Sequence, residues 1–327
     1  MLLSRKLLLR ILGTLWLIDG LLQLEPKMFT MDMVNGIMVP TLHSQPSPIA
    51  TSLHWIITIT TQHLTLVNLL IAIVQICLGI GLLLFPERWG KALVIASVVW
   101  AFIVWFGGEG LSMLLTGQGS ILTGAPGAVL LYPLLGLVVY PRQQSRSTSK
   151  DAAARPMMSG LLSHLQLRWA LSGFWLFGAL LQLQPYWWQP GQISQAIGSM
   201  TGQGGLNRIL VDPFLQGLSN ITASIEVPLN IALIVVFLAL GLTLVLLKEE
   251  QMRPALIASI VASLVIWYCT QGLGQIFTGM STDFNSGLLL VVMALACWPK
   301  GHFLSAVRVR FARQTRRAKV AGLTRPA

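Results

Sequence analysis

Eight apolar stretches recur along the 327-residue chain, and they constrain its fold more than any other feature. They cover residues 7–24, 64–85, 92–115, 127–140, 169–184, 228–247, 254–277 and 286–298. A bilayer core of about 30 Å needs roughly 20 apolar residues per helical span, and only the fourth and eighth stretches are short. Charged residues make up 10% of the chain, and the mean hydropathy is +0.71. The sequence therefore predicts an all-α, polytopic membrane protein with eight transmembrane helices.

The basic residues gather at one end of these stretches. They precede the first, join the second to the third, the fourth to the fifth and the sixth to the seventh, and follow the eighth. Only Lys27 and Arg208 fall on the other side. The positive-inside rule then predicts a multi-pass protein of the plasma membrane with cytoplasmic N- and C-termini. Because the net charge of +11 is spread over several loops, no nucleic-acid partner is expected.

The two halves of the sequence resemble each other. ILGTLWLIDGLLQLEP, which contains Trp16, matches ALSGFWLFGALLQLQP, which contains Trp175. WFGGEGLSMLLTG from Trp105 matches WYCTQGLGQIFTG from Trp267. Since each copy holds an even number of spans, we expect two parallel four-helix repeats. The predicted divisions are a first membrane unit at 1–142, a cytoplasmic linker at 143–167, a second membrane unit at 168–300 and a basic cytoplasmic tail at 301–327.

The loop after the first span of each unit contains a helix-start signal. Ser47-Pro48 begins one segment and Asp212-Pro213 the other, with Ser or Asp expected at the N-cap and Pro at the first helical position. We expect amphipathic helices lying on the outer surface there. The basic tail is expected to lie against anionic lipid at the cytoplasmic face.

Two acidic residues interrupt the apolar stretches of the first unit. Asp19 lies in the first span and Glu109 in the third, and an ionisable group inside a span is a functional-site hypothesis because burying its charge is costly. Other polar and aromatic residues share their faces at helical spacing. The predicted ligand-binding set is Trp16, Asp19, Gln23, Asn68, Gln75, Trp105, Glu109, Ser112 and Thr116. Gly178 and Gln271 replace the two acids in the second unit, which is therefore expected to serve as a scaffold or hold a neutral pocket.

Four interpretations of this set remain open. The side chains would form hydrogen bonds between helices with one or both acids protonated. They would instead bind the head group of a quinone or lipid-like molecule, or line a path for protons or cations. The fourth interpretation is a metal site that adds His54 and His63 to the acids, although these histidines are not at ligand spacing on one helix. In the second unit, Asp283 and Asn285 are expected to cap the last span.

The opening helices resemble a known family. RILGTLWLIDGLL from Arg10 and GIGLLL from Gly79 look like the DoxX-like group of small four-helix membrane proteins. The second unit keeps Arg168, Trp175 and Gly241. This group includes the membrane subunit of thiosulfate:quinone oxidoreductase, so the resemblance implies a quinone-linked redox setting. A tandem arrangement of two units departs from the usual single unit, and no catalytic residue is carried over.

Three functions follow from these observations as hypotheses. The leading one is a DoxX-like accessory subunit, without catalytic activity of its own, that binds a quinone or lipid-like ligand or supports a membrane redox partner. No cofactor is evident apart from a quinone, because haem, flavin and thiol signatures are missing and Cys77, Cys269 and Cys297 have no regular spacing. The alternatives are a proton-coupled transporter of small solutes and a purely structural anchor or assembly factor.

Overall fold

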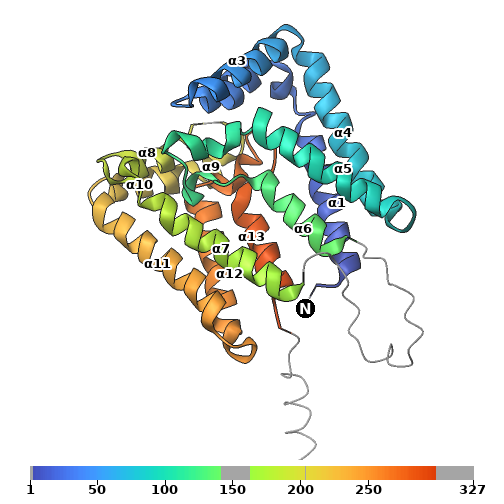
Figure 1. Ribbon diagram of the computed structural model, residues 1–327. Helices are drawn as coiled ribbons and strands as arrows, with labels where there is room; N and C mark the ends of the chain where they lie inside the picture. The colour runs from blue at the N-terminus through green and yellow to red at the C-terminus, as the bar shows by residue number, and fades with distance from the viewer. Residues whose placement is uncertain (1–2, 141–162, 203, 300–327) are drawn as a thin grey trace, which may run out of the picture.

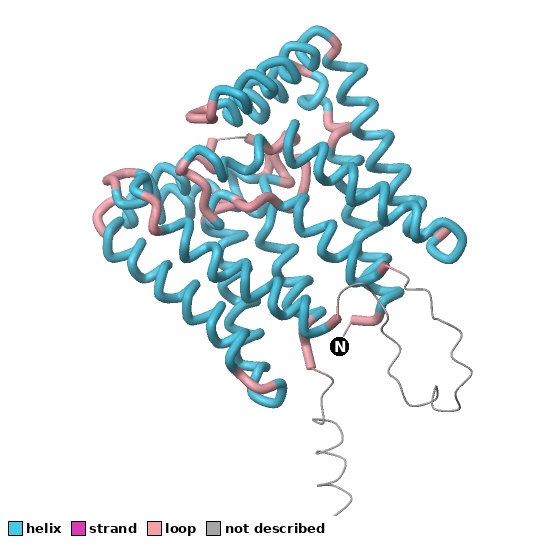
Figure 2. Tube along the Cα trace, in the orientation of Figure 1, coloured by secondary structure: helices cyan, strands magenta, loops and turns pink. Residues whose placement is uncertain are grey.

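The computed structural model describes residues 3–140, 163–202 and 204–299 (Figure 1). Over this described part the chain forms helices joined by loops, without a β-strand (Figure 2), which confirms the all-α prediction. The predicted tail at 301–327 and residues 143–162 of the predicted linker lie outside the described residues. Residues 164–167 of that linker already belong to a helix, which begins at a capping box formed by Ser163 and Gln166.

Each predicted span coincides with a helix. These helices are α1 (Arg5–Leu22), α4 (Leu64–Leu84), α5 (Pro86–Gly107), α6 (Leu131–Val139), α7 (His164–Gln182), α11 (Glu226–Leu246), α12 (Met252–Cys269) and α13 (Asn285–Ala296). Within the described ranges, four helices are long and apolar enough to cross a membrane: Leu64–Leu84, Pro86–Gly107, Glu226–Leu246 and Glu249–Cys269. By length and composition, the chain is therefore a multi-pass membrane protein.

The long helices carry their apolar side chains outward. Leu70 and Ile73 of α4 and Ile95, Val99 and Ile103 of α5 are all exposed. Polar Asn68 and Gln75, in contrast, lie on the buried side of α4. Contiguous exposed apolar surface is unfavourable in water and typical of a face that meets lipid.

Glycines bring α1 and α4 into close contact. A Cβ atom added to Gly79 would lie 2.5 Å from the backbone N of Leu17, and one added to Gly20 would lie 2.9 Å from the carbonyl oxygen of Ala72. The pair α7 and α11 approaches similarly, since a Cβ atom on Gly241 would lie 2.6 Å from Leu176. Without a hydrophobic driving force between helices in lipid, small residues allow the close packing that holds such pairs together.

The short helices α6 and α13 occupy the centre of the molecule. In Figure 1 they lie between the group α1, α4 and α5 and the group α7, α11 and α12. Most residues of α6 and α13 are buried, and the two helices contact each other. Because their surroundings are protein rather than lipid, they do not need the full length of a lipid-exposed span.

The third and seventh predicted spans end earlier than expected. The predicted stretches 92–115 and 254–277 continue past the ends of α5 at Gly107 and of α12 at Cys269. Beyond α5 the backbone turns left-handed from Gly110 to Met113, with φ of 53° at Gly110. Beyond α12 the same conformation begins at Gly272, with φ of 52°. Glycine adopts positive φ without steric cost, so each span stops at its glycine-containing segment.

The two helix-start signals are confirmed as helix starts but not as side-chain caps. Helix α3 (Ser47–Gln62) and helix α10 (Asp212–Thr222) begin at the predicted residues, and neither has a side-chain hydrogen bond at its N-cap. Oδ2 of Asp212 instead accepts a hydrogen bond from the backbone N–H of Gly202 at 2.9 Å. The cap prediction was wrong because this carboxylate holds the loop that precedes α10. Two short helices, α8 (Gln192–Gly198) and α9 (Asn207–Leu210), complete that region.

Candidate functional site

Asp19 lies in the interior of the first unit, on α1. Its side chain is 2% exposed, and its Oδ2 accepts a hydrogen bond of 2.7 Å from the Tyr132 hydroxyl of α6. The Tyr132 ring packs edge-on against Trp16, with ring centroids 4.7 Å apart. Trp16 in turn donates from Nε1 to the Ser97 hydroxyl of α5 at 2.6 Å. Asp19 and Trp16 are therefore held by side chains from two other helices.

Glu109 lies just beyond the end of α5, where the left-handed turn begins. Its Oε2 accepts a hydrogen bond of 2.7 Å from the Ser112 hydroxyl, and its Oε1 accepts one of 3.2 Å from the backbone N–H of Val129. Trp105 donates from Nε1 to the Pro126 carbonyl oxygen at 2.7 Å. Val129 belongs to the helical turn η6 (Ala128–Leu130), which precedes α6. Glu109 therefore occupies the favourable N-terminal end of the helical segment that carries Tyr132.

A third acid reaches this region from the second half of the chain. The negative charge of Asp283 acts on Asp19, Glu109 and Tyr132. Burial raises the pKa of Asp283, while hydrogen bonds from the Asn285 N–H and the Thr282 hydroxyl lower it. Oδ1 of Asp283 accepts the N–H of Asn285, the first residue of α13, at 2.6 Å, although the N-cap position itself is Phe284 and has no side-chain cap bond. An acidic residue of the second half therefore acts electrostatically on the region that holds Asp19 and Glu109.

A loop of the first half enters the second unit in the same manner. The Ile121 carbonyl oxygen accepts a hydrogen bond of 3.0 Å from Nε2 of Gln271, and the Ser120 hydroxyl accepts one of 2.6 Å from Nε2 of Gln182. The side chain of Ile121 fills the space beside Gly178, where any Cβ atom would collide with it. Each unit therefore has its interior completed by a loop of the other.

The remaining residues of the predicted ligand-binding set differ in their burial and in whether they contact the acids. Gln23, Asn68 and Gln75 are buried, and Nδ2 of Asn68 donates to the Gln23 carbonyl oxygen at 2.8 Å. Ser112 and Thr116 do not continue a helical face, because α5 ends at Gly107. Ser112 still reaches Glu109 through the turn, whereas the Thr116 hydroxyl donates to the Met113 carbonyl oxygen of its own turn at 2.7 Å.

Five buried acceptor atoms of the first half have no hydrogen-bond partner among the described residues: Asp19 Oδ1, Gln23 Oε1, Gln45 Oε1, Asn68 Oδ1 and Gln75 Oε1. In the second unit the atoms that correspond to Gln23 Oε1 and Asn68 Oδ1, Gln182 Oε1 and Asn230 Oδ1, are equally unpartnered. Positions 19 and 75 correspond to Gly178 and Phe237, which carry no side-chain acceptor. The acceptors of Asp19 and Gln75 are therefore particular to the first unit.

Sequence reasoning missed the closest partner of Asp19. The sequence feature that points to this partner is the Tyr132 hydroxyl, because a hydroxyl group inside the apolar stretch 127–140 needs a hydrogen-bond partner. Asp283 was recognised, but only as a residue of the second unit. Its role in the first unit depends on contacts between distant segments, which local patterns do not reveal.

The metal interpretation gains no support. His54 and His63 are both exposed. In the part of the chain that the structure describes, no three His, Cys, Asp or Glu side chains lie close enough together to hold a metal ion.

The capping contact of Glu109 gives a testable prediction. In the second unit, Oε1 of Gln271 accepts the N–H of Gly287 at the start of α13 at 3.0 Å, which parallels the contact between Glu109 and Val129. We therefore expect Glu109→Gln to retain nearly full thermal stability, while Glu109→Ala loses about 1–3 kcal/mol because it leaves the Val129 N–H unpaired. Thermal denaturation in mild detergent measures the stability of both variants. Equal destabilisation by the two substitutions would contradict the capping role.

No protein-family model, curated protein sequence or solved structure matches this chain. The DoxX-like resemblance of its opening helices therefore stays a prediction. What the site does has to be inferred from its own contacts.

Proposed function

We propose that this chain is an eight-span protein of the plasma membrane, built from two parallel four-helix units with both termini in the cytoplasm. Paired contacts support the duplication. Trp16 donates to Ser97 as Trp175 donates to Ser259, and Asn68 donates to the Gln23 carbonyl oxygen as Asn230 donates to that of Gln182. The distribution of basic residues supports the orientation.

We further propose that the first unit takes up and releases a proton at the cluster formed by Asp19, Glu109, Asp283 and Tyr132, as in a proton-coupled transporter of small solutes. The observation that carries this proposal is the buried Oδ1 of Asp19, which has no hydrogen-bond partner among the described residues. Asp19 is buried, and the charges of Asp283 and Glu109 act on it, so its ionisation is costly.

A quinone fits this cluster less well. The carbonyl oxygens of a quinone are acceptors and need donors from the protein, whereas Asp19, Gln23, Asn68 and Gln75 present unpartnered acceptor oxygens. A proton bound at Asp19 turns its unpartnered Oδ1 into a donor, so this atom no longer needs a donor from the protein. The quinone hypothesis stays a prediction, and extraction of purified protein for a bound quinone tests it.

A comparison with Glu226 distinguishes proton binding at Asp19 from a purely structural role of that residue. This buried carboxylate of α11 accepts hydrogen bonds from Ile193 N–H, Ser194 N–H and the Ser194 hydroxyl, the last at 2.6 Å. Three donors fix the position of this carboxyl group at the start of α8. Asp19 has a single donor, Tyr132, so its second oxygen is available to a proton.

The test is an infrared titration of the full chain in mild detergent or proteoliposomes, which follows the carbonyl band of protonated carboxyl groups. We expect a band that disappears and returns as pH is cycled through the physiological range, and that is absent in Asp19→Asn. Asparagine keeps the acceptor for the Tyr132 hydroxyl, so the fold should persist. Proteoliposomes of the wild type should also show pH-dependent solute uptake, which Asp19→Asn abolishes.

Glu226→Gln is the matched control, because it also replaces a buried carboxyl group by an amide. We expect it to reduce stability and leave the titrating band in place. If the wild type shows no titrating carboxyl band, or if Asp19→Asn retains it, the cluster only links helices and the proposal is wrong.

A further inference from the structure

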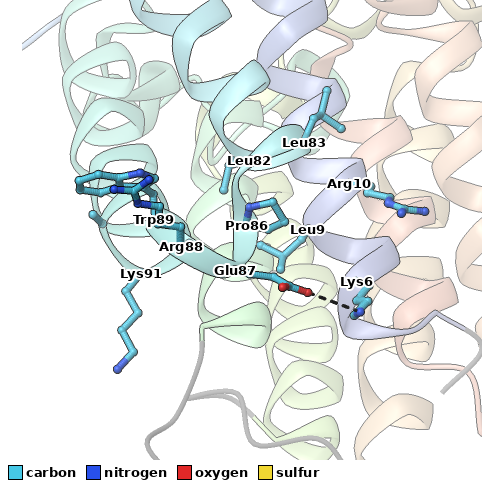
Figure 3. A pocket seen from close by; sticks show the side chains of 12 residues that line it. Lys6, Leu9, Arg10, Leu82, Leu83, Pro86, Glu87, Arg88, Trp89 and Lys91 are labelled. Carbon is cyan, nitrogen blue, oxygen red and sulfur yellow. Dashed lines mark ion pairs between the residues drawn. The ribbon is translucent and has the colours of Figure 1, made fainter.

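A basic cavity opens beside the turn between α4 and α5, next to the first turns of α1 (Figure 3). Its volume is about 640 Å³. Its charged lining consists of Lys6, Arg10, Arg88, Lys91 and Glu87. Glu87 lies 3.8 Å from Lys6, and both side chains are highly exposed, so this ion pair is weak. Four cations against one carboxylate make the cavity attractive to an anion.

The cavity lies at the edge of the apolar surface. The turn that forms it joins α4 and α5, two of the helices long and apolar enough to cross a membrane. Trp89 is 53% exposed there, and the Arg88 guanidinium lies 5.6 Å from the centre of its ring. Tryptophan next to arginine and lysine is typical of the level of lipid head groups.

An apolar groove continues from this cavity along α4 and α5. It has a volume of about 520 Å³, and Val74, Leu78, Val99 and Ile103 are among its lining residues. Ala92 lines both the groove and the basic cavity. From Ala92 to Ile103 the α5 axis advances by about 16 Å, at roughly 1.5 Å per residue. The groove therefore runs from the head-group level well into the apolar layer.

We infer that the cavity and groove together bind one anionic phospholipid. The phosphate lies at the mouth of the cavity, which Arg10, Arg88 and Lys91 line with long, exposed side chains that turn inward to donate charge-assisted hydrogen bonds to its oxygens. One acyl chain follows the groove between α4 and α5. This inference rests on residence in a membrane and is independent of proton binding at Asp19.

The second unit lacks the space for such a lipid. A Cβ atom added to Gly90 would meet nothing within 4 Å. At the offset that pairs Trp105 with Trp267, Gly90 corresponds to Met252, which is fully buried. Lys91 corresponds to Arg253 at the same offset. A methionine fills the region that glycine leaves open, so the site is particular to the first unit.

The experiment is native mass spectrometry of the full chain in mild detergent, titrated with phosphatidylglycerol or phosphatidylcholine. We expect phosphatidylglycerol to bind about tenfold more tightly, and Arg10→Gln and Lys91→Gln each to weaken it about fivefold. Gly90→Met should abolish the preference by filling the cavity. The matched control, Arg253→Gln, should leave binding unchanged. Circular dichroism confirms that each variant is folded before its binding is compared.

Three results would overturn the inference: equal affinity for the two lipids, an equal loss in Arg253→Gln, or retention of the preference in folded Gly90→Met. A soluble competitor separates a lipid from a free anion. If glycerol phosphate displaces phosphatidylglycerol at equal concentration, the groove contributes nothing, and the site takes a soluble anion rather than a lipid.

Discussion

Gly79→Leu is expected to lower the apparent melting temperature of the protein in mild detergent by roughly 5–10 °C. The reason lies at the crossing of α1 and α4, where a Cβ atom on Gly79 would lie 2.5 Å from the backbone N and 2.7 Å from the Cα atom of Leu17. Backbone atoms cannot move aside as a flexible side chain does, so the two helices must separate. We expect a loss on the order of 3 kcal/mol.

Gly173→Leu is the matched control for this prediction. Gly173 lies on an exposed face of α7, where an added Cβ atom would meet nothing within 4 Å. Leucine favours a helix over glycine, so this substitution should be neutral or slightly stabilising. Equal melting temperatures for the two variants would show that α1 and α4 do not approach each other at Gly79.

The course of the helices was predictable from apolarity alone. A stretch such as 64–85 leaves no alternative to a helix in lipid, and α4 covers Leu64–Leu84. The ends of α5 and α12 were not predictable in this way. Apolar residues continue past Glu109 to residue 115, but Gly110 begins a left-handed turn that the backbone conformation reveals. Apolarity indicates the environment of a segment, whereas the turn depends on the backbone angle φ, which apolarity does not determine.

Part of the candidate site was predictable from the sequence, namely the burial of its polar residues. Asp19 is as buried as its place in an apolar stretch implies, and Asn68 is buried on the same side of α4 as Gln75. The partners Tyr132 and Asp283 were not predictable from spacing, because they lie more than a hundred residues from Asp19 and reach it through tertiary packing. Long-range contacts of this kind are set by how helices and loops pack, which periodicity does not encode.

Comparison of corresponding positions in the two halves distinguishes residues that hold the helices together from residues of the candidate site. Contacts found in both, such as Trp16 with Ser97 and Trp175 with Ser259, hold helices together wherever the sequence motif occurs. Asp19 has no such counterpart, because its position is Gly178 in the second half and Ile121 fills the space. A buried carboxyl group that the fold does not require in one half is more readily explained by function than by packing.

Ile121→Ala is expected to destabilise the protein by about 2–5 kcal/mol, through a cavity in the unit to which Ile121 does not belong in sequence. Ile121 is fully buried and packs beside Gly178 of α7. Ile209→Ala provides the matched control, because Ile209 is 74% exposed and its truncation leaves no cavity. Thermal denaturation in mild detergent compares the two. If both substitutions have the same small effect, the loop of the first half does not enter the second unit.

A double-mutant cycle tests the same contact atom by atom. Ile121→Val removes the Cδ1 methyl group, the atom nearest to a Cβ atom built on Gly178, and leaves the Cγ1 position 2.8 Å from that Cβ atom. Alone, Ile121→Val should cost about 0.5–1.5 kcal/mol by leaving a small void, and Gly178→Ala about 1–3 kcal/mol by overpacking. Together they move one methyl group from the loop to the helix, so the loss of the double variant should be smaller than the sum of the two single losses. Strictly additive losses would mean that the two positions do not touch, because only residues in contact show such coupling.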